Sequence, residues 1–114
     1  MTKNTNEQIL KLLLLMAFAD KVYMAEEKEL IIKTSNKLGI SKEKVDEIIS
    51  EVVETEDITK ECRATANKIQ NKQDKEKTIK LLSEMIATDK IVDKKELFAF
   101  QIIAEEWGML TNRD

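Results

Sequence analysis

The chain has 114 residues, of which 42% are apolar and 36% charged, so it can form one domain with a buried core, and wholesale disorder is excluded. Lys and Arg number 19 against 22 Asp and Glu, and the net charge of −3 argues against nucleic-acid binding, which requires clustered positive charge. Because there is no His and a single Cys, the composition excludes His-based catalysis, His metal ligands, an intrachain disulfide and Cys-cluster metal sites.

The pattern of residues along the chain predicts an all-α fold. There is no Pro and there are only two Gly, so almost nothing interrupts helices. One helical face is visible in the spacing i, i+3, i+4, i+7, i+8 of apolar residues, which are Val45, Ile48, Ile49, Val52 and Val53. We predict a single domain over residues 1–114, built as a compact bundle of about six helices.

The first predicted helix, Asn6–Asp20, is apolar on nearly all sides and should lie at the centre of the bundle. Its apolar stretch, Ile9–Ala19, contains Lys11 and is about half as long as the roughly 20 residues that span a bilayer. We therefore interpret it as a core helix and expect a cytoplasmic protein.

Capping residues place the other five helices. Two predicted helices end before a glycine: Ala25 to Leu38 before Gly39, and Asp93 to Trp107 before Gly108. The three between them run from the cap Ser41 to about Glu54, from Asp57 or Thr59 to near Asn71, and from the cap Asp74 to near Asp89. Asp93 and Glu96 form the pattern of a capping box. Cys62 lies on the apolar face of its helix, which predicts a buried, unreactive thiol.

The two glycines mark an internal repeat, because their separation of 69 residues (108 − 39) recurs elsewhere. The same offset matches Leu12 with Leu81, Met16 with Met85, Asp20 with Asp89, Lys21 with Lys90 and Glu27 with Glu96. The two copies span about residues 9–40 and 78–109, and each is a helix, a loop and a second helix. One hairpin alone cannot bury its apolar face, so we predict two hairpins related by a pseudo-two-fold axis.

The repeated segments resemble the TerB-like family, the small all-helical domains named for bacterial tellurite resistance. A segment of the family's M-A-x-A-D-G-x-[VI]-x-x-x-E type is present twice, as MAFADKVYMAEE at 16–27 and MIATDKIVDKKE at 85–96. The resemblance implies a non-catalytic adaptor in stress-response systems, with a protein partner and often near the membrane, whose acids hold a divalent cation. The metal ligands that it implies are Asp20, Glu27, Asp89 and Glu96. The chain departs from the pattern at Lys21 and Lys90, where the family usually has Gly.

The residues alone leave two interpretations of these acids open. Asp20 and Asp89 fall at predicted helix C-termini, where the helix dipole disfavours an acid by about 0.3–1 kcal/mol, so something must compensate. If the four carboxylates gather, their hard oxygens suit Ca²⁺ or Mg²⁺. In the other interpretation Glu96 is only part of a cap, and Lys21 and Lys90 form surface ion pairs with the acids, each worth about 0–1 kcal/mol.

Two other functions stand beside the cation-binding adaptor. A protein-interaction module without metal would use an apolar groove, or an exposed patch around Trp107, Met109 and Leu110. An enzyme would have only carboxylate or Lys chemistry, because the sequence has no His and no Gly-rich phosphate loop. We therefore expect no catalysis and no cofactor other than the divalent cation.

Overall fold

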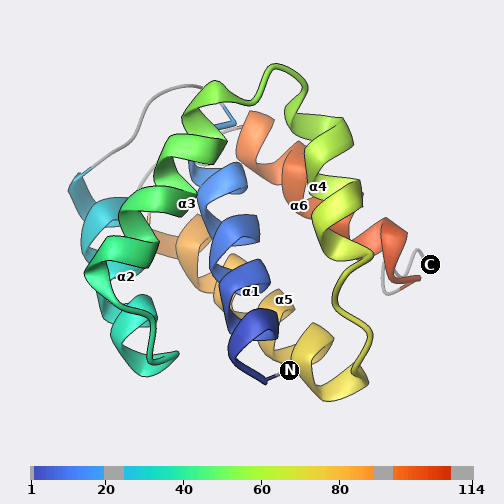
Figure 1. The fold of residues 1–114 in the computed structure, drawn as a ribbon. Helices are drawn as coiled ribbons and strands as arrows, with labels where there is room; N and C mark the ends of the chain where they lie inside the picture. Colours follow the sequence, from blue (N-terminus) through green and yellow to red (C-terminus); the bar gives the residue numbers. More distant parts are fainter. Residues whose placement is uncertain (1, 20–24, 89–93, 109–114) are drawn as a thin grey trace.

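The first helix, α1, lies at the centre of the protein, as predicted. In the computed structural model, which describes residues 2–19, 25–88 and 94–108, α1 spans Thr2–Ala17. From Ile9 to Ala17 every side chain except that of Lys11 is at most 1% exposed. The helix contacts all five of the others (Figure 1). A helix that is apolar on all sides is stable only when it is surrounded in this way.

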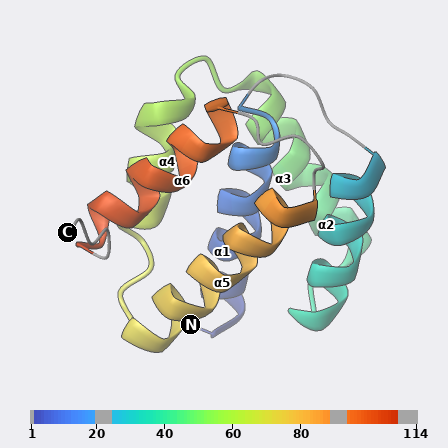
Figure 2. The ribbon, with the colours of Figure 1, turned by 180° about the vertical axis from the view of Figure 1, so that it is seen from behind.

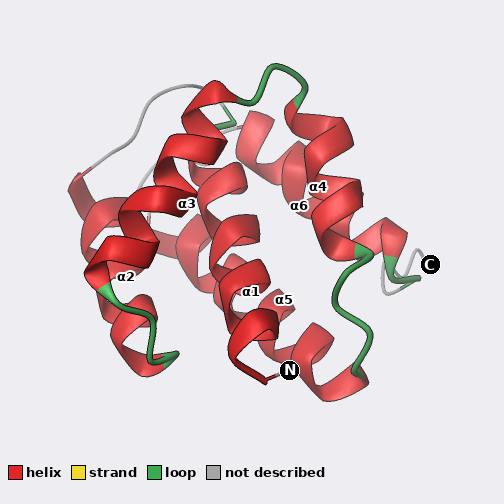
Figure 3. Cartoon of the chain, viewed as in Figure 1, coloured by secondary structure: helices red, strands yellow, loops and turns green. Residues whose placement is uncertain are grey.

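Five helices surround α1, and the described residues contain no strand (Figure 3). They are α2 (Ala25–Lys37), α3 (Lys42–Glu54), α4 (Ile58–Ala66), α5 (Lys72–Thr88) and α6 (Lys94–Glu106). The radius of gyration of 13.0 Å is that of a compact chain of this length. Within the described ranges, no helix combines the length and the apolar character that crossing a bilayer requires. The predicted all-α bundle is therefore confirmed.

The two predicted hairpins, α1–α2 and α5–α6, pack so that helices of one hairpin contact helices of the other. In the first hairpin, α1 contacts both α5 and α6; in the second, α5 contacts both α1 and α2 (Figures 1 and 2). A pseudo-two-fold relation between hairpins would produce such crossed packing, and the relation itself stays a prediction. Of the connecting helices, α3 packs on α1, and α4 packs on α1 and α6.

Several helix ends lie where the capping residues predict them. Gly39 and Gly108 have φ angles of 71° and 66°, the left-handed conformation that ends a helix. The Ser41 side chain accepts a hydrogen bond from the backbone N–H of Lys44, and the Asp57 side chain caps α4 in the same way. Of the two predicted starts for this helix, Asp57 is therefore the right one.

The segment between α4 and α5 differs from the prediction. The helix α4 ends at Ala66 rather than near Asn71, and Ile69 turns back into the core at 1% exposure. The predicted cap Asp74 is wrong, because the Asn71 Oδ1 accepts hydrogen bonds from the N–H groups of Gln73 and Asp74, at 2.8 and 3.2 Å. The earlier cap satisfies the first free donors of α5, so Asp74 falls within its first turn.

Gly39→Ala should lower the free energy of unfolding by about 1 kcal/mol, because a left-handed φ disfavours any residue with a Cβ. An added Cβ would meet no atom within 4 Å, so backbone strain is the whole cost. Gly39→Asn should recover part of the loss, since Asn tolerates this conformation. Urea denaturation measures the effect, and equal midpoints for the Ala and Asn variants would contradict this explanation.

Candidate functional site

The end of α1 meets the beginning of α6. After Ala17 the backbone continues in a turn, with hydrogen bonds from Phe18 N–H to Leu14 O at 2.9 Å and from Ala19 N–H to Met16 O at 3.1 Å. Ala19 lines a pocket of about 100 Å³ together with Lys95 and other residues at the start of α6. Both views show the two helix ends side by side (Figures 1 and 2). The end of the first helix of the first copy, α1, therefore lies against the start of the last helix of the second copy, α6.

Glu96 lies at this junction, in the first turn of α6, and is only 2% exposed. The dipole of α6 favours a carboxylate in this turn. Burial of a carboxylate is nevertheless costly unless hydrogen bonds or a positive charge accompany it. Of the four predicted ligands, Glu96 is the one whose side chain the structure describes.

The other three predicted ligands cannot be placed. Asp20 and Asp89 lie outside the described residues, as do Lys21, Lys90 and the predicted cap Asp93. Glu27 belongs to the first turn of α2, and its side chain lies outside the part of the structure that is described. The predicted grouping of the four acids, and the capping box of Asp93 with Glu96, therefore stay predictions.

The two helix starts that carry the repeated glutamates lie apart. In both views the first turn of α2 lies on the other side of the end of α1 from the first turn of α6 (Figures 1 and 2). The backbone therefore brings Glu96 near the end of the first hairpin's α1, not near the start of its α2. Among the described side chains, no three His, Cys, Asp or Glu residues are close enough to hold a metal ion.

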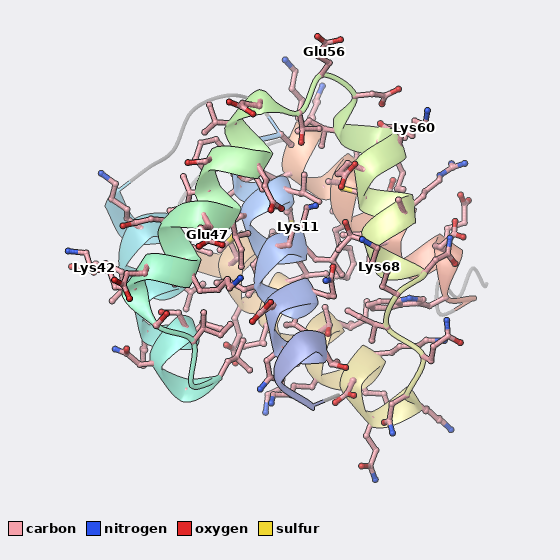
Figure 4. The ribbon with its side chains drawn as sticks, in the orientation of Figure 1. Lys11, Lys42, Glu47, Glu56, Lys60 and Lys68 are labelled. Carbon is pink, nitrogen blue, oxygen red and sulfur yellow. The ribbon has the colours of Figure 1, made fainter. Side chains whose placement is uncertain are left out.

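A charged group lies where α1 packs against α3 and α4. Lys11 points between α3 and α4 (Figure 4), with its Nζ 2.7 Å from Glu61 Oε2 and 3.4 Å from Glu51 Oε1. Burial by itself lowers the pKa of Lys11, but the hydrogen bond and charge of Glu61, with a contribution from Glu51, raise it above its usual 10.5. The group is an ordinary ion-pair network that ties α1 to α3 and α4.

Lys11→Met should destabilise the protein by about 1 kcal/mol at pH 7, since it removes a charged hydrogen bond that is only partly shielded from water. Because the folded-state pKa of Lys11 is raised, the stabilisation is complete below pH 10.5 and disappears as the pH rises through the folded-state pKa. Urea denaturation at pH 7 and above pH 11 should show the difference between wild type and variant shrinking. The control Lys44→Met, which removes an exposed pair with Glu47, should have no measurable effect. A difference that is unchanged at high pH would contradict the prediction.

Cys62 is buried, as its position on the apolar face of α4 predicts. Its side chain lines the same 100 Å³ pocket as Ala19. Burial, with a smaller effect from the charge of Glu61, raises the pKa of the thiol to about 12. The thiolate is the nucleophile and the metal ligand, so a thiol with this pKa suits neither role.

Of the predicted apolar patch around Trp107, Met109 and Leu110, the structure describes Trp107 alone. Trp107 is half-buried, and its Nε1 donates a hydrogen bond of 2.9 Å to the backbone oxygen of Ala66, so it packs as a core residue. Met109 and Leu110 lie outside the described residues. Large exposed apolar side chains occur instead at Ile32, Val53, Leu97 and Phe98. The helical period marks these positions as apolar but does not show which of them lack a neighbour.

Comparison with known proteins gives one match. The model of the family described as "Tellurite resistance protein TerB" matches residues 6–109. The match covers nearly the whole chain, including both copies of the repeat and the helices between them. No curated protein and no solved structure matches the chain significantly. The family match thus agrees with the helical fold and with the resemblance carried by the two repeated segments.

Proposed function

Because the chain belongs to the TerB family, we propose that it is a non-catalytic helical adaptor domain that binds a divalent cation through its paired acidic loops. The observation that carries this proposal is the burial of Glu96 beside the end of α1. Its position in the first turn of α6 favours the charged carboxylate, which is the form that binds a divalent cation. The family membership supports the further proposal of an adaptor role in a bacterial, cytoplasmic stress response of the tellurite-resistance type, with a protein partner.

The residues proposed to hold the cation supply oxygen ligands alone, from Asp20, Glu27, Asp89 and Glu96. Carboxylate oxygens are the ligands of Ca²⁺ and Mg²⁺, and Mg²⁺ would retain several of its waters. The bound ion would offset the repulsion among the acids and fix the two loops relative to the helices. Lys21 and Lys90 would compete with the ion for the acids, because an ammonium beside a carboxylate weakens its binding of a cation.

The absence of catalysis is proposed on chemical grounds. The sequence has no His, and Cys62 is buried with its pKa raised to about 12. A general base or a nucleophile would therefore have to be a carboxylate or a Lys. Binding of a cation by the acids requires neither a general base nor a nucleophile, so it is the simpler function for these residues.

Calorimetric titration with Ca²⁺ and Mg²⁺, followed by backbone amide NMR, tests the cation site. The wild type should bind one equivalent, with the largest shifts at Phe18, Ala19 and the first turn of α6. Glu96→Gln should weaken binding at least tenfold, because it removes one charged ligand. Asp20→Asn/Asp89→Asn should weaken it further.

The control variant is Glu76→Gln/Glu106→Gln, which removes two exposed acids outside the loops. It changes the net charge by as much as Asp20→Asn/Asp89→Asn does. It should bind the ion like the wild type. A wild type that shows no saturable shift with either ion would overturn the cation half of the proposal. If cation binding weakens equally in the control and in the loop variants, the binding depends only on net charge and not on a site.

A further inference from the structure

One end of the molecule carries an apolar surface that the cation site does not use. Val53, at the end of α3, is 61% exposed, and Phe98, in α6, is 56% exposed. Ile58, at the start of α4, lines two pockets, one beside each of these side chains. The end of α3 and the starts of α4 and α6 lie at the same end of the bundle (Figure 1). We call the surface formed by Val53, Ile58 and Phe98 the apolar corner.

The apolar corner combines a protruding ring with a hollow of matching size. The larger pocket has a volume of about 260 Å³ and is lined by Phe18, Val52, Val53, Thr55 and Ile58, which are all apolar except Thr55. A cavity of about 150 Å³ in another protein holds benzene, so this pocket has room for a phenylalanine ring. It is smaller than the roughly 300–1,000 Å³ of typical small-molecule sites, which favours a single side chain as its occupant.

The charges around the apolar corner are divided into two halves. From Glu54 to Thr59 the chain carries three acidic residues, Glu54, Glu56 and Asp57, and no basic one. Glu54 and Glu56, beside the larger pocket, are exposed, and Glu56 points outward from the loop between α3 and α4 (Figure 4). At the starts of α4 and α6, the helices that carry Ile58 and Phe98, the exposed charges include Lys60 and Lys94. The surface thus has an acidic half around the hollow and a basic half around the ring.

We propose that the apolar corner binds a second copy of this chain in a symmetric dimer, with Phe98 of each copy in the larger pocket of the other. A two-fold axis places the same patch on both sides of an interface, so each contact occurs twice. Lys94 lies one helical turn before Phe98 on the same face of α6, and therefore enters the interface with it. The axis then sets the basic half of one copy against the acidic half of the other.

Charge complementarity favours this occupant over a purely basic or a purely acidic partner. A partner of a single charge would be attracted by one half of the apolar corner and repelled by the other half. A second copy, turned by 180°, meets both halves with the opposite charge. The patch is small, so we expect a weak dimer whose population depends on protein concentration.

Sedimentation velocity over a wide range of protein concentration, up to near-millimolar, tests the dimer. The wild type should shift from monomer to dimer as the concentration rises. Phe98→Ser should weaken association at least about thirtyfold, the effect of removing a central interface anchor. The matched control Ile32→Ser alters a residue on α2 that is 57% exposed and should leave association unchanged. A wild type that stays monomeric throughout, or a dimer that survives Phe98→Ser, overturns the proposal.

A charge exchange tests the pairing of the two halves. Glu54→Lys/Glu56→Lys and Lys60→Glu/Lys94→Glu should each be monomeric alone, because each sets like charges against one another. A one-to-one mixture of the two variants should restore the dimer, since every facing pair is again opposite in sign. The helix dipoles favour Lys at the end of α3 and Glu in the first turns of α4 and α6, so three of the substitutions suit the fold. A mixture that remains monomeric would contradict the two-fold arrangement.

Discussion

Leu13→Ala should lower the free energy of unfolding by about 3 kcal/mol, within the range of 2–5 kcal/mol found for buried leucines. Leu13 is 1% exposed in the middle of α1, and its neighbours along the helix are buried as well. The five surrounding helices hold one another in place, so the core cannot collapse fully into the space left by the deleted atoms. Urea denaturation followed by circular dichroism measures the loss.

The control for this prediction is Ile32→Ala on α2. Ile32 is 57% exposed, so truncation removes few contacts, and Ala has the higher helix propensity. The free energy of unfolding should change by less than about 0.5 kcal/mol. A loss at Leu13 no greater than the loss at Ile32 would mean that α1 is not the centre of the core.

Alkylation of Cys62 by iodoacetamide at pH 8 should be about a thousandfold slower in the folded protein than in urea. Each unit of pKa changes the thiolate fraction tenfold, and burial raises the pKa from 9.0 to about 12. Exclusion of the reagent from a fully buried side chain slows the reaction further. Mass spectrometry of timed samples gives both rates.

Two comparisons check the cause of this slow alkylation. The folded-state rate should rise in proportion to hydroxide between pH 7 and 9, without a plateau, because the thiol does not titrate in this range. Leu13→Ala should increase the rate at the same pH by raising the population of open molecules. A folded-state rate within tenfold of the rate in urea would mean that Cys62 is accessible and reactive.

The arrangement of the helices was predictable where local chemistry decides it. Gly39 and Gly108 end their helices because few other residues adopt a left-handed φ, and Ser41 begins α3 through its own side chain. The end of α4 was not predictable, because residues 67–71 are compatible with a helix. What ends α4 is the burial of Ile69 and the cap at Asn71, which depend on the packing of the rest of the bundle.

For the candidate site, the sequence predicts a set of residues but not their geometry. The repeat identifies Glu96 from its match with Glu27, yet its burial depends on where the end of α1 lies. The apolar corner gave no signal of its own. Val53 lies beside Val52 in the apolar pattern, and only the way that α3 packs on α1 decides that Val52 is 1% and Val53 61% exposed.

The position of α1 also affects how the protein is made. Synthesis proceeds from the N-terminus, so the apolar stretch from Ile9 to Ala17 leaves the ribosome before any of the five helices that cover it. Its contacts with α6 join segments some eighty or more residues apart along the chain. Until α6 emerges, the apolar residues of α1 have an incomplete cover. The cover of α1 is therefore completed only when α6 has emerged, and a chaperone that shields apolar helices would act on α1 first.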